Sequence, residues 1–224
     1  SSIKEAVNYV LLRTNGKLDA LVNNAGFGLT AAVEDLTREE LRNQFEVNVF
    51  GLVELTNIII PVFRKQGYGR IVNVSSVAGK FSLPYMGAYA SSKFALEALS
   101  DALRLELSGT KTYVSIIEPG LIKTKFSENS LRIFEELKNK DKSYHSEVYK
   151  NIIERRKDKS KESRKFPALA VAKKILHALE SKRPRSRYLI APDAYIMSFS
   201  KKCLPDSFID FIGRIYMRKY RSRN

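Results

Sequence analysis

The chain has 224 residues, 44% of them hydrophobic and 28% charged, and its 39 basic and 24 acidic side chains give a formal net charge of +15. This balance is typical of a globular protein and excludes a disordered or fibrous chain. The single cysteine, Cys203, excludes an intrachain disulfide, the two histidines beside it argue against a zinc cluster, and the lack of a run of about 18 apolar residues excludes a transmembrane helix.

The first residues show a helical pattern. Apolar side chains recur at helical spacing from residue 3 to residue 11, and the pattern stops at Asn15-Gly16. Neither an initiator Met nor a signal-peptide pattern precedes this helix. We therefore expect the chain to begin inside a larger protein.

Short apolar runs alternate with longer helical patterns as far as residue 125. Three runs predict strands, at residues 18–22, 70–74 and 113–117. One helix is predicted to start after Thr37, which forms a capping-box pair with Glu40, and to continue through Leu55; another is predicted at residues 89–107. The strands are almost wholly apolar, as in a parallel sheet covered by helices on both faces. The pattern predicts an open α/β sheet with right-handed crossovers.

The second part of the chain has a different character. Residues 123–166 are polar, lysine-rich and helical in pattern, and we interpret them as a mobile lid over a site at the strand ends. Pro167 suits the first turn of a further helix, and residues 188–190 predict a last short strand. Residues 192–224 read as a basic extension of two helical pieces, within one domain that spans residues 1–224 and is incomplete at its N-terminus.

The basic charge is concentrated in this second part. Residues 1–125 hold 14 basic and 12 acidic side chains, whereas residues 126–224 hold 25 and 12. Such charge attracts nucleic acid, anionic lipid or an anionic ligand, although a solvated surface is the more ordinary interpretation. No zinc-finger spacing or aromatic stacking signature accompanies it, so nucleic-acid binding is a minor hypothesis.

Polar and small residues follow each predicted strand. They are Asn23-Asn24-Ala25-Gly26, Ser75-Ser76 and Glu118-Pro119-Gly120. Ligands of open parallel sheets bind beyond the carboxyl ends of the strands, so these residues are candidates for a binding site. Each of them also marks an ordinary turn.

Tyr89 and Lys93 form the most informative pair. Residues four apart share a helix face, so the ammonium lies near the phenol. At about 6 Å and an effective dielectric of about 20, this charge would lower the pKa of Tyr89 from about 10 to about 8, within the range of acid–base catalysis. With 11 tyrosines in the chain, about one such spacing is expected by chance.

Together these features resemble the short-chain dehydrogenase/reductase family. The family's Asn-Asn-Ala-Gly matches residues 23–26, its Asn-x-x-Gly residues 48–51, its Tyr-x-x-x-Lys residues 89–93, and its Pro-Gly followed by Thr residues Pro119, Gly120 and Thr124. Its serine lies thirteen residues before the tyrosine, which selects Ser76 over Ser75. The stretches 81–84 and 94–97 look like the branch with 17β-hydroxysteroid and retinol dehydrogenases.

The resemblance implies a Rossmann-like doubly wound parallel sheet and hydride transfer between NAD(P)(H) and an alcohol/carbonyl pair. Tyr89 would exchange the proton with the substrate oxygen, and Ser76 would hydrogen-bond that oxygen. Lys93 would bind the nicotinamide ribose and lower the pKa of Tyr89. Asn48 would fix a water linked to Lys93, unless it is an ordinary helix asparagine bonded to nearby backbone.

The resemblance also assigns cofactor contacts. Its adenosine-side residues are Asn24, Ala25 and Gly26, and its nicotinamide-side residues are Pro119, Gly120, Ile122 and Thr124. NADP is slightly preferred to NAD because the chain is basic. The substrate is expected to be a small secondary alcohol or ketone, lipophilic and steroid-like or retinoid-like.

The chain departs from the family at its start. The family opens with a strand and a glycine-rich turn that places the pyrophosphate at a helix N-terminus, whereas the first glycine here is Gly16. About 80 residues of a typical member would lie upstream of Ser1, and without them the strand at 18–22 would be exposed. We expect those residues to exist in the molecule.

The C-terminal tail carries a second hypothesis. Apolar residues between Phe208 and Tyr216 lie beside Arg214, Arg218, Lys219, Arg221 and Arg223, as in helices that lie on anionic membranes. Packing of this apolar face on the lid or on a second subunit is at least as strong an alternative. We expect a cytoplasmic homo-oligomer, and peripheral membrane contact is a further hypothesis. The rival hypotheses are a catalytically silent dinucleotide-binding protein and an anion or nucleic-acid binder that uses the basic second half.

Overall fold

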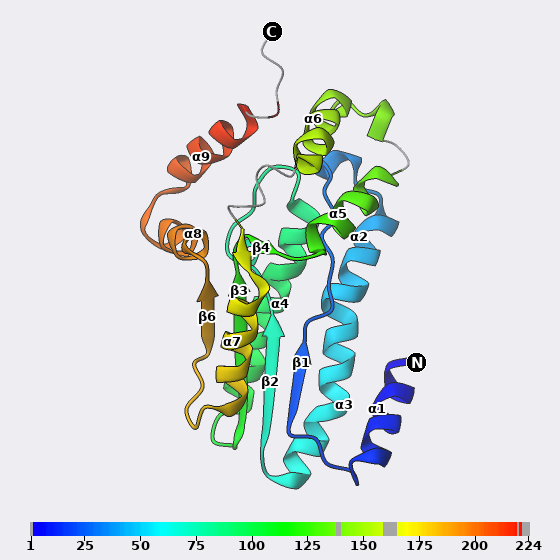
Figure 1. Cartoon of the computed structure of the whole chain (residues 1–224), viewed down its shortest axis with the longest axis vertical. Helices are drawn as coiled ribbons and strands as arrows, with labels where there is room; N and C mark the ends of the chain where they lie inside the picture. Colours follow the sequence, from blue (N-terminus) through cyan, green and yellow to red (C-terminus); the bar gives the residue numbers. More distant parts are fainter. Residues whose placement is uncertain (1, 138–139, 159–164, 219, 221–224) are drawn as a thin grey trace.

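Four parallel strands form the centre of the molecule, and their order in the sheet is β1 (Ala20–Asn23), β2 (Gly69–Val74), β3 (Thr112–Pro119) and β6 (Arg187–Ile190). The computed structural model describes residues 2–137, 140–158, 165–218 and 220 (Figure 1). The registers place Ala20 opposite Arg70, Gly69 opposite Thr112 and Ile116 opposite Arg187. The carboxyl ends of all four strands therefore lie on the same side of the molecule, as predicted.

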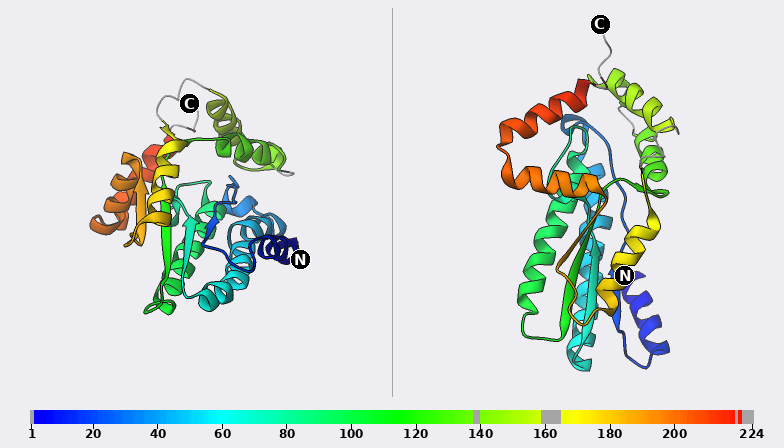
Figure 2. Two further views of the ribbon diagram at one scale, coloured as in Figure 1. Left: turned by 60° about the horizontal axis from the view of Figure 1, so that its bottom comes forward. Right: turned by 60° about the vertical axis from the view of Figure 1, so that its left-hand side comes forward.

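Helices cover both faces of this sheet. On one face, Ile71 and Val114 pack with α1 (Ser2–Arg13), α3 (Gly51–Gln66) and α4 (Gly87–Glu106). On the other, Val72 and Ile117 pack with α7 (Ala168–Glu180). Neighbouring residues of a strand point to opposite faces, which is why these strands are apolar throughout. In the right-hand view of Figure 2 the strands lie between α4 and α7.

The helix before β2 is longer and less regular than predicted. It starts as α2 (Arg38–Phe45), where Thr37 and Glu40 form the expected capping box, and continues into α3 through a π-helical segment at Glu46–Phe50. A π-helical segment inside an α-helix frequently occurs at a functional site, and this one contains Asn48.

This helix corrects the exclusion of a membrane span. Residues Arg38–Gln66 contain an 18-residue window with a mean hydropathy of 1.5, so by length and composition this helix is apolar enough to cross a membrane. In the structure it lies along the sheet and buries Thr56, Ile59 and Phe63. The search for an uninterrupted apolar run missed this helix because Asn and Glu residues interrupt it. The mean hydropathy of a window stays high despite a few such residues.

The described parts of residues 123–166, which we interpreted as a lid, are mainly helical, as expected, with one addition. It contains α5 (Phe126–Glu135), a 3-10 turn at Lys140–Lys142 and α6 (Ser146–Lys157). Phe134, Tyr149 and Ile152 pack on Ala32 and attach these helices to the loop after β1. A two-residue ladder of β4 (Ile122–Lys123) with β5 (Phe166–Pro167), which the sequence did not predict, brings the two ends of the segment together.

The C-terminal helices follow the prediction. They are α8 (Pro192–Cys203) and α9 (Asp206–Arg218), with the break at Pro205 between them. Figure 1 shows both beyond β6, on the side away from α1. At the opposite side β1 pairs with β2 alone among the described strands, and Val22 is 37% exposed there.

Candidate active site

The polar groups that follow the strands meet at one end of the molecule. Asn24, Ala25 and Gly26 follow β1, and Ser75 and Ser76 follow β2. Tyr89 lies in the first turn of α4, which begins after the loop from Ser76. Figure 1 shows α5 and α6 above these strand ends. Parallel strand order thus brings residues distant in sequence to one site.

The Ser76 hydroxyl lies close enough to the Tyr89 phenol to lower its pKa. The Ser76 Oγ also accepts a 3.1 Å hydrogen bond from the backbone N–H of Ala78, and the following residues Val77–Gly79 form a tight 3-10 turn. A backbone hydrogen bond therefore fixes the position of the Ser76 hydroxyl. Its hydroxyl and the phenol lie where one carbonyl oxygen can contact both.

Tyr89 is buried, and this reverses the expected direction of its pKa. The residue is 7% exposed, and the Phe126 ring of α5 lies 5.6 Å from its ring. Burial raises the pKa of Tyr89 because it disfavours the phenolate, and the Ser76 hydroxyl lowers it by less. The predicted lowering by Lys93 was therefore wrong: burial is the largest effect on this pKa, and Lys93 is not among the groups that shift it.

Lys93 lies one helical turn behind the phenol. Its Nζ is 5.9 Å from the centre of the Tyr89 ring and donates a 2.9 Å hydrogen bond to the Val74 carbonyl. Burial lowers the pKa of Lys93 to about 8, and the charge of Glu97 opposes this effect. An ammonium has three N–H donors, and among the described residues only the Val74 carbonyl accepts a hydrogen bond from it. Two donors are thus available for a ligand with hydroxyl groups.

Gly26 lies against this ammonium. A β-carbon at Gly26 would be 3.1 Å from the Asn48 Oδ1 and 3.6 Å from the Lys93 Nζ. The glycine therefore leaves its backbone open directly beside Lys93. The place beside Lys93 is thus open on the Gly26 side to a ligand that has hydroxyl groups.

Asn48 is bonded mainly to the protein backbone. Its amide donates to the Phe27 carbonyl at 3.0 Å and to the Ser92 Oγ at 3.0 Å, and its oxygen accepts from the Phe27 N–H at 3.1 Å. It holds the loop after Gly26 on α4. These contacts match the structural alternative raised for Asn48, and its water-binding role stays a prediction.

The remaining predicted residues lie after β3. Gly120 donates its N–H to Ile190 at 3.0 Å, and a β-carbon at Gly120 would overlap the Asp193 carboxylate. Pro119 ends β3, Ile122 belongs to β4, and the exposed Thr124 accepts a 3.3 Å hydrogen bond from the Phe126 N–H. This segment carries the chain from the sheet to α5, and among the described residues it forms no hydrogen bond with Tyr89 or Lys93.

Two residues near the site were missed in the sequence. Phe126 contacts Tyr89 from the lid, and nothing in the sequence identified it within a polar segment. Glu97 follows Lys93 at the same four-residue spacing that joins Tyr89 to Lys93, which was a usable signal. No cluster of three or more metal-ligating side chains occurs among the described residues.

Comparison with known proteins agrees with this geometry. The sequence pattern of the short chain dehydrogenases matches residues 1–132. The 3-ketodihydrosphingosine reductase of Bacteroides thetaiotaomicron is 34% identical over 218 residues, covering 96% of this chain and 78% of that protein. The human dehydrogenase/reductase SDR family member 9 is 35% identical over 222 residues, covering 94% and 68%.

A solved structure shows the same fold. A short chain dehydrogenase/reductase of Burkholderia phymatum, in complex with NAD, superposes with a TM-score of 0.74 at 25% identity and covers 93% of this chain and 72% of its own. The family pattern spans more than half of the chain, and both relatives align along nearly all of it. The chain therefore belongs to the short-chain dehydrogenase/reductase family of oxidoreductases.

Proposed function

We propose that the protein transfers a hydride between NAD(P)(H) and a secondary alcohol or ketone with a lipophilic body. The observation that carries this proposal is the position of the Ser76 hydroxyl beside the Tyr89 phenol, with the Lys93 ammonium 5.9 Å from the centre of the Tyr89 ring. Three side chains from two elements converge on one point, which a coincidental Tyr-x-x-x-Lys spacing does not produce.

The residues of the chain handle the proton. During reduction the Tyr89 O–H donates its proton to the carbonyl oxygen, and during oxidation the phenolate takes it back. Ser76 donates a hydrogen bond to the same oxygen and orients it toward the phenol. Lys93 favours the phenolate through its charge. The cofactor supplies or accepts the hydride.

The cofactor is proposed to bind at the strand ends. The two free N–H groups of Lys93 and the open backbone at Gly26 support contact with a ribose. The neighbouring structure from Burkholderia phymatum contains NAD. The slight preference for NADP rests on the basic charge alone, and titration of the protein with NADH and NADPH by fluorescence decides between them.

The lipophilic substrate is proposed from the lid and from one relative. Phe126 covers Tyr89 with an apolar ring, so the described residues near the reacting oxygen include an apolar wall. The relative from Bacteroides thetaiotaomicron is named for a lipid ketone. Residues 123–166 would then open to admit a steroid-like, retinoid-like or other long apolar ketone.

A panel of ketones with NADH and NADPH tests this proposal. Tyr89→Phe should lose turnover by about 10²- to 10⁴-fold, the range for a general acid, with cofactor affinity little changed. Phe keeps the ring and its packing on Phe126. If Tyr89→Phe turns over apolar ketones as fast as the unmodified protein, the silent-binding hypothesis is correct instead.

Self-association is proposed from exposed apolar side chains on α4. Phe94, Leu99 and Leu105 are 43%, 44% and 64% exposed. Burial of these side chains against a second copy removes apolar surface from water. Light scattering at micromolar concentration should detect a dimer or larger assembly, and Leu105→Lys should weaken it. If the unmodified protein and Leu105→Lys are both monomeric, this proposal is contradicted.

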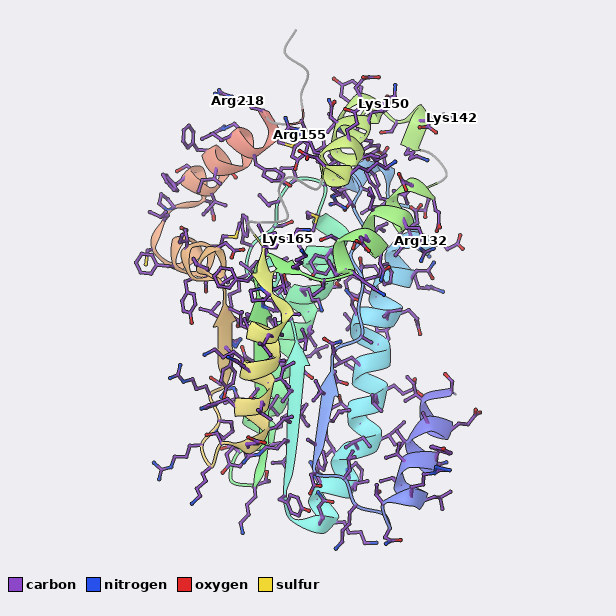
Figure 3. The ribbon with its side chains drawn as sticks, in the orientation of Figure 1. Arg132, Lys142, Lys150, Arg155, Lys165 and Arg218 are labelled. Carbon is purple, nitrogen blue, oxygen red and sulfur yellow. The ribbon has the colours of Figure 1, made fainter. Side chains whose placement is uncertain are left out.

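Peripheral contact with an anionic membrane, in the cytoplasm, is proposed for α8 and α9. Their exposed apolar side chains, between 42% and 68% accessible, are Tyr195, Ile196, Phe199, Phe208, Phe211 and Ile215. On α9 these alternate with Arg214 and Arg218, and residues 192–224 hold seven basic against three acidic side chains. Figure 3 shows further basic side chains from α5, α6 and α9 at the same end of the molecule. Apolar and basic groups together suit an anionic lipid surface.

Vesicle co-sedimentation tests this contact. The protein should pellet with vesicles that contain phosphatidylserine and less with phosphatidylcholine alone. Phe208→Ser with Phe211→Ser should reduce pelleting, whereas Leu12→Ser, on the distant and exposed surface of α1, should not. Equal recovery of all forms in the supernatant contradicts the proposal.

A further inference from the structure

A buried carboxylate continues the row of side chains that begins with Tyr89 and Lys93. On α4, Glu97 stands four residues after Lys93, as Lys93 stands four after Tyr89, so the three lie along one face. Tyr89, Lys93 and Glu97 are 7%, 5% and 6% exposed, respectively. Glutamate is seldom buried this deeply without a partner. Its charge favours the ammonium form of Lys93.

Glu97 lies among charged groups from other elements. Its carboxylate forms an ion pair with the Arg187 guanidinium of β6 at 3.1 Å, and its oxygens and the nearby Ser75 hydroxyl have no hydrogen-bond partner among the described residues. Glu118, near the end of β3 and fully buried, forms ion pairs with Lys80 at 2.8 Å and with Arg187 at 3.3 Å. The charged groups that face Glu97 are Lys93 and Asp101 on α4, Lys80 after the 3-10 turn, Glu118 on β3 and Arg187 on β6.

A glycine allows this close packing. A β-carbon at Gly79 would be 2.8 Å from the Glu97 Cγ, 2.9 Å from the Ser75 Oγ and 3.1 Å from the Lys93 carbonyl oxygen. The turn that follows Ser76 therefore rests directly on α4 at Glu97. Through this contact the Glu97 side chain packs on the turn that follows Ser76.

We propose that Glu97 is a positioning residue for hydride transfer, which holds the Lys93 ammonium charged beside the Tyr89 phenol and braces the Ser75–Ser76 segment. This role rests on the function proposed for Tyr89 and Lys93. Its electrostatic part, the dependence of the Lys93 charge on Glu97, is a property of the chain itself.

The two groups change charge in neighbouring pH ranges. Burial raises the pKa of Glu97 to about 7, with a further increase from Glu118 and opposing effects of Ser75, Arg187 and Lys80. Burial lowers the pKa of Lys93 to about 8. Between these values Glu97 is ionised and favours the ammonium. Without its charge, Lys93 loses its proton at lower pH, and the phenolate of Tyr89 loses the support of that charge.

An NMR titration measures this dependence directly. The intact protein is labelled with ¹³C-lysine, and the Lys93 Cε signal is assigned with Lys93→Arg. Glu97→Gln should move the Lys93 midpoint down by about one pH unit, a tenfold change in proton affinity. Asp101→Asn is the matched control. Asp101 is one turn further along α4 and pairs with the same Arg187 at 2.6 Å, and it forms no ion pair with Lys93 among the described residues.

The outcomes separate an electrostatic role from a structural one. An unchanged Lys93 midpoint in Glu97→Gln overturns the proposal, and so does an equal shift in Asp101→Asn. If Glu97→Gln does not fold, the unmodified protein decides: its Lys93 signal should show a second, smaller inflection near pH 7 as Glu97 ionises, and a single-step titration overturns the proposal.

Kinetics then test the positioning role. At pH 8, Glu97→Gln should lower kcat by about tenfold with little change in the KM of the ketone, and the alkaline limb of its kcat profile should move to lower pH. Asp101→Asn should keep the profile of the unmodified enzyme. If the panel of ketones shows no activity with any form, the proposed function fails, while the NMR result still decides the link between Glu97 and Lys93.

Discussion

Substitution of Gly79 by alanine tests how tightly the turn after Ser76 sits on the helix that carries Tyr89. The added β-carbon would lie 2.8 Å from the Glu97 Cγ and 2.9 Å from the Ser75 Oγ, both closer than carbon contacts in folded proteins allow. It would also lie 3.1 Å from the backbone oxygen of Lys93, which is fixed within α4 and does not move alone. The turn must therefore shift away from α4.

The expected cost has two parts. Overpacking of a filled interior typically lowers the free energy of unfolding by about 1–3 kcal/mol. A displacement of Ser76 from Tyr89 by up to about 1 Å should lower kcat/KM by about 100-fold, because the two hydroxyls no longer meet the same oxygen. Catalysis should thus be affected more than stability.

Urea unfolding and steady-state kinetics measure the two parts. Gly213→Ala is the control, since no atom lies within 4 Å of a β-carbon there and the residue is in α9. Alanine in a helix should stabilise the protein by up to about 1 kcal/mol and leave kinetics unchanged. If Gly79→Ala unfolds and reacts like the unmodified protein, the turn is not seated on Glu97 as the distances indicate.

Three further predictions concern stability. Thr37→Ala removes the capping box with Glu40 and should lower the free energy of unfolding by about 1 kcal/mol in urea, whereas Thr37→Ser should retain most of it. The Phe63 side chain is 1% exposed between α3 and the sheet, so Phe63→Ala leaves a cavity there. Calorimetry should show a free energy of unfolding that is lower by about 3–5 kcal/mol. The folded protein raises the pKa of Glu97 from 4.5 to about 7, so it binds more protons than the unfolded chain between these values; stability from this group should be complete below pH 4.5 and fall as pH rises toward 7. Unfolding of Glu97→Gln across this range should lack that component, and an identical pH dependence in both proteins would contradict the assignment.

Local pattern predicted most of the elements. The apolar runs at residues 18–22, 70–74 and 113–117 became β1, β2 and β3, because strands buried on both faces must be apolar throughout. The capping box at Thr37 placed the start of α2 correctly, since it depends only on residues within one turn. The spacing of Tyr89 and Lys93 predicted a shared helix face for the same reason.

Features that depend on distant residues were not predicted. The π-helical segment at Glu46–Phe50 and the ladder of β4 with β5 have no local signature, because packing and pairing with remote parts of the chain produce them. The helix at Arg38–Gln66 was apolar enough to pass as a membrane span, and only its position against the sheet shows what it covers.

The site shows the same division. Helical spacing drew attention to Tyr89 and Lys93, and the resemblance to the family selected Ser76 over Ser75. The protonation of Tyr89 did not follow from the sequence: its pKa was predicted to fall and it rises, since burial of the phenol depends on how the chain folds around it. The ion pair of Glu97 with Arg187 likewise required α4 and β6 to meet. Sequence determined which chemical groups are present and which helix or strand bears them, whereas folding decided how much water and how many opposite charges surround each one.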